Sequence, residues 1–294
     1  MPAVHDRRAG AIAALAVLAL VWGYNWVVMK VAVHDAPPFQ FAAWRTCGGA
    51  VALVATALAL RKPLRPQYPL PFLAIGFFQT TGFVGLVTWA VESAGAGQVA
   101  MLAYTMPLWV SLLAWPALGE RIGGWQAAAI AIAFAGVACM AGPLRTAGIA
   151  EALAVSAGFL WAIGVILTKR LQRRAQVDVF GLTMWQMLFG AAMLLVVALL
   201  VPAHATTWSA SYIAAIAYNI VFATALAYIL WTFVLDVLPA HDASMGTLAN
   251  PIVGVLAAWL QLGEIPSRLS ALGMFLIVVG LIVLSMADRR AAQA

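Results

Sequence analysis

Hydrophobic residues fill ten long stretches of this chain, separated by short polar or turn-rich segments. A helix rises about 1.5 Å per residue, so about twenty apolar residues cross the hydrocarbon of a bilayer. Pro37-Pro38, Arg61-Lys62-Pro63 and Gly142-Pro143 are typical of the boundaries. The pattern therefore predicts an all-α integral membrane protein with ten transmembrane helices, at residues 10–33, 39–60, 70–91, 96–117, 122–142, 148–168, 178–201, 208–235, 240–262 and 267–287.

Composition excludes the other broad classes of protein. Hydrophobic residues make up 65% of the 294 positions and charged residues 9%, with a mean hydropathy of +0.98. Because soluble domains carry about 25% charged residues, this is neither a soluble globular protein, a disordered chain nor a nucleic-acid binder. The first apolar run extends to Val33 and is too long for a cleavable signal peptide. Cys47 and Cys139 lie inside apolar runs, as packing residues do.

Lysine and arginine residues gather on one side of this topology. With the N-terminus inside, the cytoplasmic segments hold twelve of them and the outer segments hold three, Lys30, Arg145 and Arg268. Arg45 alone lies inside a span. The positive-inside rule therefore predicts that both termini are cytoplasmic.

The second half of the chain repeats the first. Trp22 and Lys30 are eight residues apart, as are Trp161 and Lys169. Five spans is an odd number, so the second unit enters the membrane from the opposite side, and the repeats at 1–145 and 146–294 are inverted. Secondary transporters commonly have this architecture, with a midplane site between the units. Five further positions recur after a shift of 144 residues: Pro107, Trp115, Gly119, Glu120 and Gly136, matched by Pro251, Trp259, Gly263, Glu264 and Gly280.

These motifs carry a family resemblance over about residues 10–287. The chain resembles the drug/metabolite transporter superfamily, and within it the ten-helix EamA type, in Trp22-Gly-Tyr-Asn25 with Lys30, in Pro38 with Arg45, and in Pro107 followed by Gly119-Glu120. The second half departs from the pattern, because Ala162-Ile163-Gly164 follows its tryptophan and no arginine matches Arg45.

The resemblance implies a function. It implies a multi-pass protein of the bacterial inner membrane that exports small metabolites, most simply amino acids including aromatic ones, by alternating access. The expected partners are a small-molecule substrate and the lipid bilayer, with no nucleic acid and no cofactor, and two fused repeats suit a functional monomer. A multidrug or other metabolite exporter of the same superfamily, or a channel, remains the alternative.

An enzyme is disfavoured by the residues themselves. The four histidines, His5, His34, His204 and His241, lie near span ends and are not at ligand spacing with Cys or Glu. The chain has neither a G-x-S-x-G nor a P-loop motif, so we expect no metal, no catalytic residues and no ATP-driven pumping.

The candidate site consists of neutral polar and aromatic residues. Glu92, Glu120, Asp236 and Glu264 all lie near span ends, so a zwitterion fits the middle of the membrane better than a lipophilic cation. For each candidate the alternative is a hydrogen bond or packing contact between helices. Pseudo-symmetry predicts that the two tryptophans of the set are partners across the central axis. The predicted substrate-binding residues are Trp22, Asn25, Gln79, Tyr104, Trp161, Tyr218, Asn219, Tyr228 and Asn250.

Prolines and charges complete the predicted site. Pro107 and Pro251 each remove a backbone hydrogen bond within a predicted helix, as a hinge or helix break that shapes the site, or as a plain kink. Lys30 is expected to snorkel, and Arg45 to cap carbonyls, pair with a terminal carboxylate or bind a substrate carboxylate.

Glu120 and Glu264 are expected to be solvated at the membrane interface, to pair with Arg121 and Arg268, or to form gates. Because no Asp, Glu or His lies at the centre of a span, facilitated export without proton coupling is predicted.

Overall fold

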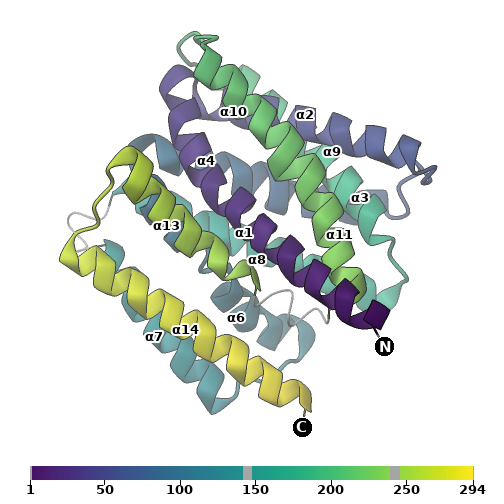
Figure 1. Ribbon diagram of the computed structural model, residues 1–294, viewed down its shortest axis with the longest axis vertical. Helices are drawn as coiled ribbons and strands as arrows, with labels where there is room; N and C mark the ends of the chain where they lie inside the picture. The colour runs from purple at the N-terminus through teal and green to yellow at the C-terminus, as the bar shows by residue number, and fades with distance from the viewer. Residues whose placement is uncertain (1, 142–147, 239–245, 294) are drawn as a thin grey trace.

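The protein is a bundle of helices, described by a computed structural model over residues 2–141, 148–238 and 246–293. Every regular element in these ranges is helical. The described ends of the chain, in the first and last helices, lie at the same end of the bundle (Figure 1). An even number of crossings accounts for that placement.

The helices follow the predicted ten spans in two sets of five. The first set comprises α1 (Pro2–Asp35), α2 (Pro38–Ala59), a third span of α3 (Pro69–Gly76), η1 (Phe77–Gly82) and α4 (Phe83–Ser93), a fourth span of α5 (Ala96–Ala103) and α6 (Met106–Leu118), and α7 (Gly124–Ala141). The second set comprises α8 (Ile149–Arg174), α9 (Val179–Leu200), an eighth span of α10 (Ala210–Ile220), η2 (Val221–Leu226) and α11 (Ala227–Val237), then α13 (Ala249–Leu262) and α14 (Arg268–Gln293).

Nine of the described helices are long and apolar enough to cross a membrane, and α13 is a shorter apolar helix. The first part of the predicted ninth span, 240–245, lies outside the described residues. Elsewhere the predicted boundaries hold to within a few residues, except that α1, α8 and α14 run further than predicted. Charged residues end the apolar runs there but do not end the helices.

The repeat extends to details of the backbone. In both repeats the third span contains a six-residue π-helix, η1 and η2, and their positions differ by 144 residues. Gly119 and Gly263 cap α6 and α13 in the left-handed conformation, with φ of 71° and 68°. Only glycine adopts that conformation without strain, which explains the matched pair of glycines.

The two matched prolines begin helices rather than bend them. The fourth span breaks at Tyr104 and Thr105, so Pro107 lies in the first turn of α6. Pro251 is likewise in the first turn of α13, which follows a break at Leu248. A proline in a first turn lacks an N–H that would have no partner there anyway, so both sites tolerate it.

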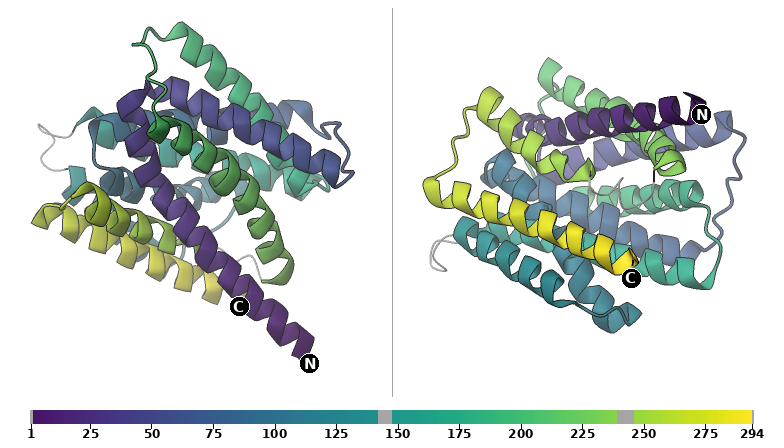
Figure 2. Two further views of the ribbon diagram at one scale, coloured as in Figure 1. Left: turned by 45° about the horizontal axis from the view of Figure 1, so that its top comes forward. Right: turned by 60° about the horizontal axis from the view of Figure 1, so that its bottom comes forward.

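The last helices of the two repeats pack closely along one side of the bundle (Figures 1 and 2). A side chain at Gly136 would lie 2.6 Å from the carbonyl oxygen of Gly273, and one at Gly273 would lie 2.6 Å from that of Gly136. Close approach of backbones through small residues is typical of helix pairs in membranes. Helices α2 and α9 form a second repeat-related pair, so the core lies between the repeats.

Candidate functional site

Of the nine predicted substrate-binding residues, four are buried and five are half-buried. Asn219 is fully buried, and Asn250 and Asn25 are 2% and 7% exposed. Gln79 is also buried, whereas Tyr104, Tyr218 and Tyr228 are half-buried. Buried amides need hydrogen-bond partners, so their contacts decide which of them belong to a site.

Trp22 and Trp161 contact the third span of the opposite repeat. The indole Nε1 of Trp22 donates to the carbonyl oxygen of Ala223 in η2 at 3.1 Å, and its ring centroid lies 6.0 Å from that of Trp231. The ring of Trp161 packs edge-on against Phe83, directly after η1, at 4.8 Å. The prediction that the two indoles are partners is therefore wrong, since the third spans occupy the positions beside them.

Glycines of the second spans also meet these π-helices. A side chain at Gly49 of α2 would lie 3.0 Å from Cγ2 of Thr224 in η2. A side chain at Gly190 of α9 would lie 2.3 Å from Cβ of Thr80 in η1. The two threonines are 144 residues apart, so each π-helix fits against a glycine of the other repeat.

This correspondence aligns the second spans and shows what sequence reasoning missed. Helices α2 and α9 both have 22 residues and begin at Pro38 and Val179, so their shift is 141 residues. Gln186 is therefore the counterpart of Arg45, and its buried Oε1 has no hydrogen-bond partner among the described residues. The shift of 144 found in the later spans hid this match.

Arg45 is a half-buried cation whose hydrogen-bond acceptor is a thioether sulfur. Its Nη1 donates to the sulfur of Met29 at 2.8 Å, and its guanidinium carbon lies 5.9 Å from the ring centre of Phe41. It also interacts electrostatically with Tyr228. Within the described part of the chain Arg45 neither caps a carbonyl nor pairs with a carboxylate, so both expected structural roles are corrected here.

Three buried asparagines have an amide oxygen without a partner in the described residues, namely Asn25, Asn219 and Asn250. The Nδ2 of Asn250 donates to the hydroxyl of Tyr104 at 2.8 Å, joining the broken fourth and ninth spans. The ring of Tyr104 also packs edge-on against Trp26, at 6.2 Å. Within the described ranges, the Nδ2 of Asn219 donates to the carbonyl of Ala215 in its own helix and to no other residue.

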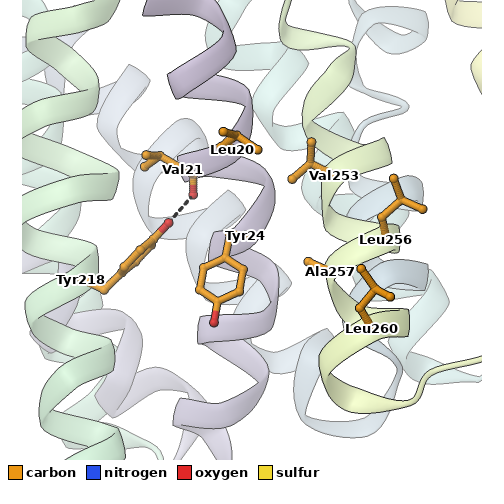
Figure 3. A pocket seen from close by; sticks show the side chains of 8 residues that line it. All are labelled: Leu20, Val21, Tyr24, Tyr218, Val253, Leu256, Ala257 and Leu260. Carbon is orange, nitrogen blue, oxygen red and sulfur yellow. Dashed lines mark hydrogen bonds between the residues drawn. The ribbon is translucent and has the colours of Figure 1, made fainter.

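Gln79 and Tyr218 have different surroundings. Gln79 fills the space beside Gly164 of α8, where a side chain would lie 2.3 Å from its Cγ. The hydroxyl of Tyr218 donates to the carbonyl of Val21 at 2.9 Å and lines an apolar groove of about 480 Å³ between α1, α10 and α13 (Figure 3). Tyr24 lines the same groove, so Tyr218 belongs to the lining of this apolar groove.

Lys30 and the two predicted gate residues hold helix ends. The ammonium of Lys30 donates to the carbonyls of Val91, Glu92 and Ala94 at the end of α4, at 2.8, 3.3 and 3.0 Å. The Glu264 carboxylate accepts from the backbone N–H groups of Ala96 and Gly97 at the start of α5.

Glu120 pairs with Arg173 at 2.8 Å and with Lys169 at 4.0 Å. The predicted pairing of the two glutamates with Arg121 and Arg268 is therefore wrong, because backbone donors and the charged end of α8 lie closer. Among the described residues no group of His, Cys, Asp and Glu is arranged to hold a metal ion.

Comparison with known proteins decides the family. A model described as the EamA-like transporter family matches residues 9–142 and again residues 148–286. The chain belongs to this family. It is therefore a multi-pass membrane transporter with a small-molecule substrate, and not an enzyme.

Relatives extend over nearly the whole chain. The uncharacterized transporter YoaV of Bacillus subtilis is 27% identical over 89% of this chain and 92% of its own length. A probable amino-acid metabolite efflux pump of Escherichia coli is 29% identical, covering 95% of both chains. A probable terminal-alkyne amino-acid exporter of Streptantibioticus cattleyicolor is 24% identical over 94% of this chain and 93% of its own.

A crystal structure of a protein with 19% sequence identity has a TM-score of 0.67, covering 96% of this chain and 99% of that chain. At that identity the match shows the fold alone.

Proposed function

We propose that this EamA-family transporter exports amino acids, aromatic ones among them, from the bacterial cytoplasm by alternating access. Two relatives named for amino-acid export match this chain over almost its full length. The protein would lie in the inner membrane with both termini in the cytoplasm and work as a monomer. Its repeats, 1–145 and 146–294, would move against each other.

The observation that carries this proposal is the polarity of the middle of the spans. Amides and hydroxyls gather there, and three asparagine oxygens have no partner among the described residues. No Asp or Glu lies at the centre of a span. Neutral groups of this kind suit a zwitterion, whereas a lipophilic cationic drug needs a fixed negative charge.

The aromatic residues around these amides favour large side chains in the substrate. Trp22 and Trp26 lie on α1 within one turn of Asn25, and Tyr104 of the fourth span contacts both Trp26 and Asn250. Aromatic rings give apolar area with few rotatable bonds, so they hold flat side chains with little loss of entropy. We therefore include aromatic amino acids in a broad specificity.

Counterflow in liposomes tests this function. Purified protein is reconstituted into vesicles preloaded with an unlabelled amino acid, and entry of the labelled amino acid is measured for a panel of twenty. Saturable entry that preloading accelerates supports a carrier for amino acids. Absence of entry for every member overturns the proposal, and entry that neither saturates nor responds to preloading indicates a channel.

A further inference from the structure

Arg45 differs in its partners from Lys30 and Arg173, two cations that hold helix ends. Lys30 donates to three carbonyls, and Arg173 pairs with Glu120 while also donating to the carbonyl of Leu118. Among the described residues Arg45 contacts a thioether and an aromatic face and interacts with the Tyr228 hydroxyl group, and none of these is a carboxylate. A charge inside the membrane requires compensation, and a planar guanidinium is best compensated by a carboxylate.

A buried hydrogen-bond acceptor without a partner among the described residues, Asn25 Oδ1, lies on α1. Trp22, Asn25 and Met29 share one face of α1, where Trp22 contacts η2 and Met29 contacts Arg45. Asn25 lies between these two contacts, and its buried Oδ1 has no partner among the described residues. One helical turn separates Asn25 from Met29, so the acceptor without a partner and the residue that Arg45 contacts lie on the same face of α1.

We propose that Arg45 binds the α-carboxylate of the transported amino acid and that Asn25 Oδ1 accepts from its α-ammonium group. The inference rests on the proposed function and names the two groups that would recognise every amino acid irrespective of its side chain. Arg45 supplies parallel N–H donors for a carboxylate, and an amide oxygen suits an ammonium donor. The side chain would then extend towards Trp22 and Tyr228.

The second repeat has no counterpart of the Arg45 guanidinium or of the Asn25 amide, so the proposed site occurs once per molecule. The counterpart of Arg45 is Gln186, and the shift of 139 that relates Trp22 to Trp161 makes Gly164 the counterpart of Asn25. Gln79 occupies the space beside Gly164. One substrate per molecule is therefore expected, held by the first and second spans of the first repeat.

The same repeat provides a matched control. Gln186 lies at the equivalent place on α9 and is buried, but it carries no charge. Its replacement by Met removes a polar group of similar size. A general effect of disturbing a second span would appear in Gln186→Met, whereas loss of carboxylate binding would appear only in the Arg45 variants.

Analogues that lack one charged group test the inference in liposomes. Inhibition of labelled amino-acid flux is measured for L-phenylalanine against phenethylamine and 3-phenylpropionate, and for L-leucine against isoamylamine and 4-methylvalerate. In the unmodified protein each amine and each acid should inhibit at least about tenfold more weakly than its amino acid, the factor expected for one charge-assisted hydrogen bond.

The variants then separate the two groups. Arg45→Gln should remove the preference for the amino acid over the amine, and Asn25→Ala should remove the preference over the deaminated acid. Gln186→Met should keep both preferences. Arg45→Lys keeps the charge and should retain part of the first preference.

Two outcomes contradict the proposal. If phenethylamine and isoamylamine inhibit the unmodified protein as well as their amino acids do, the carboxylate is not recognised and the inference is wrong, although amino-acid transport stands. If Arg45→Gln folds and keeps the full preference, another group binds the carboxylate. Failure of the proposed function is distinct, because then no amino acid exchanges in the counterflow panel.

Discussion

Gly190→Ala should destabilise the protein far more than the same change at its repeat counterpart, Gly49. A methyl group at Gly190 would lie 2.3 Å from Cβ of Thr80 and 2.8 Å from the carbonyl oxygen of Gly76. Neither atom can move by rotation of a side chain, so α9 must shift away from the third span. At Gly49 the nearest atoms belong to the side chain of Thr224, at 3.0 and 3.1 Å, and can move by tenths of an ångström.

The magnitudes follow from these contacts. Overpacking typically costs about 1–3 kcal/mol, and contact with backbone places Gly190→Ala at about 2–3 kcal/mol. That loss corresponds to a fall in melting temperature of about 4–10 °C for a chain of this size. Gly49→Ala should cost about 1 kcal/mol or less, since alanine also favours the helix by about 0.5–1 kcal/mol over glycine.

The assay is thermal unfolding of detergent-solubilised protein, followed by the monodisperse fraction that remains after heating. Gly124→Ala serves as the control, because a side chain there meets no atom within 4 Å. Its melting temperature should equal or exceed that of the unmodified protein. If Gly190→Ala melts within 1 °C of the unmodified protein, the second and third spans are less tightly packed at η1 than these contacts indicate.

Three further outcomes are expected. Single cysteines at 64 and 172, in a background lacking Cys47 and Cys139, should react with an impermeant thiol reagent only from the cytoplasmic side; labelling from outside in intact cells refutes the topology. Transport should persist in liposomes without a pH difference or membrane potential. Facilitated export is contradicted if transport depends strictly on a pH gradient and that dependence is lost on replacing His241 or Asp242, two residues outside the described ranges. Lys30→Met should cost about 1.5–3 kcal/mol in thermal unfolding by freeing carbonyls of α4, and an unchanged melting temperature would remove that capping role.

The sequence predicts the architecture of this protein well because the constraints are strong. The thickness of a bilayer sets the length of each apolar run, and the shift of 144 residues relates even the helix-capping glycines, Gly119 and Gly263. The π-helices were not predicted, since the residues Phe77–Gly82 and Val221–Leu226 have no local signal that distinguishes them from an α-helix. Each π-helix packs against a glycine of a second span, a tertiary contact that the local sequence does not reveal.

Contacts within the candidate site were harder to predict. Symmetry relates Trp22 to Trp161 but does not bring them together, because a third span lies beside each. The surroundings of Arg45 depend on how α1 and α2 are rotated about their axes. Hydrophobicity alone does not determine that rotation, because apolar residues lie on all sides of both helices. The helix on which each polar group lies was therefore predictable, whereas its hydrogen-bond partners were not.

The repeat counterpart of Arg45 is a glutamine, Gln186, and this difference has a consequence for how such a protein can be built. An assembly of two identical short chains would have to place the same residue at both positions, so two guanidinium groups would each need compensation inside the membrane. Joining the copies into one polypeptide releases that constraint, because each half can then change alone. A fused chain can therefore carry a cation on the second span of one repeat alone, whereas a symmetric homodimer cannot.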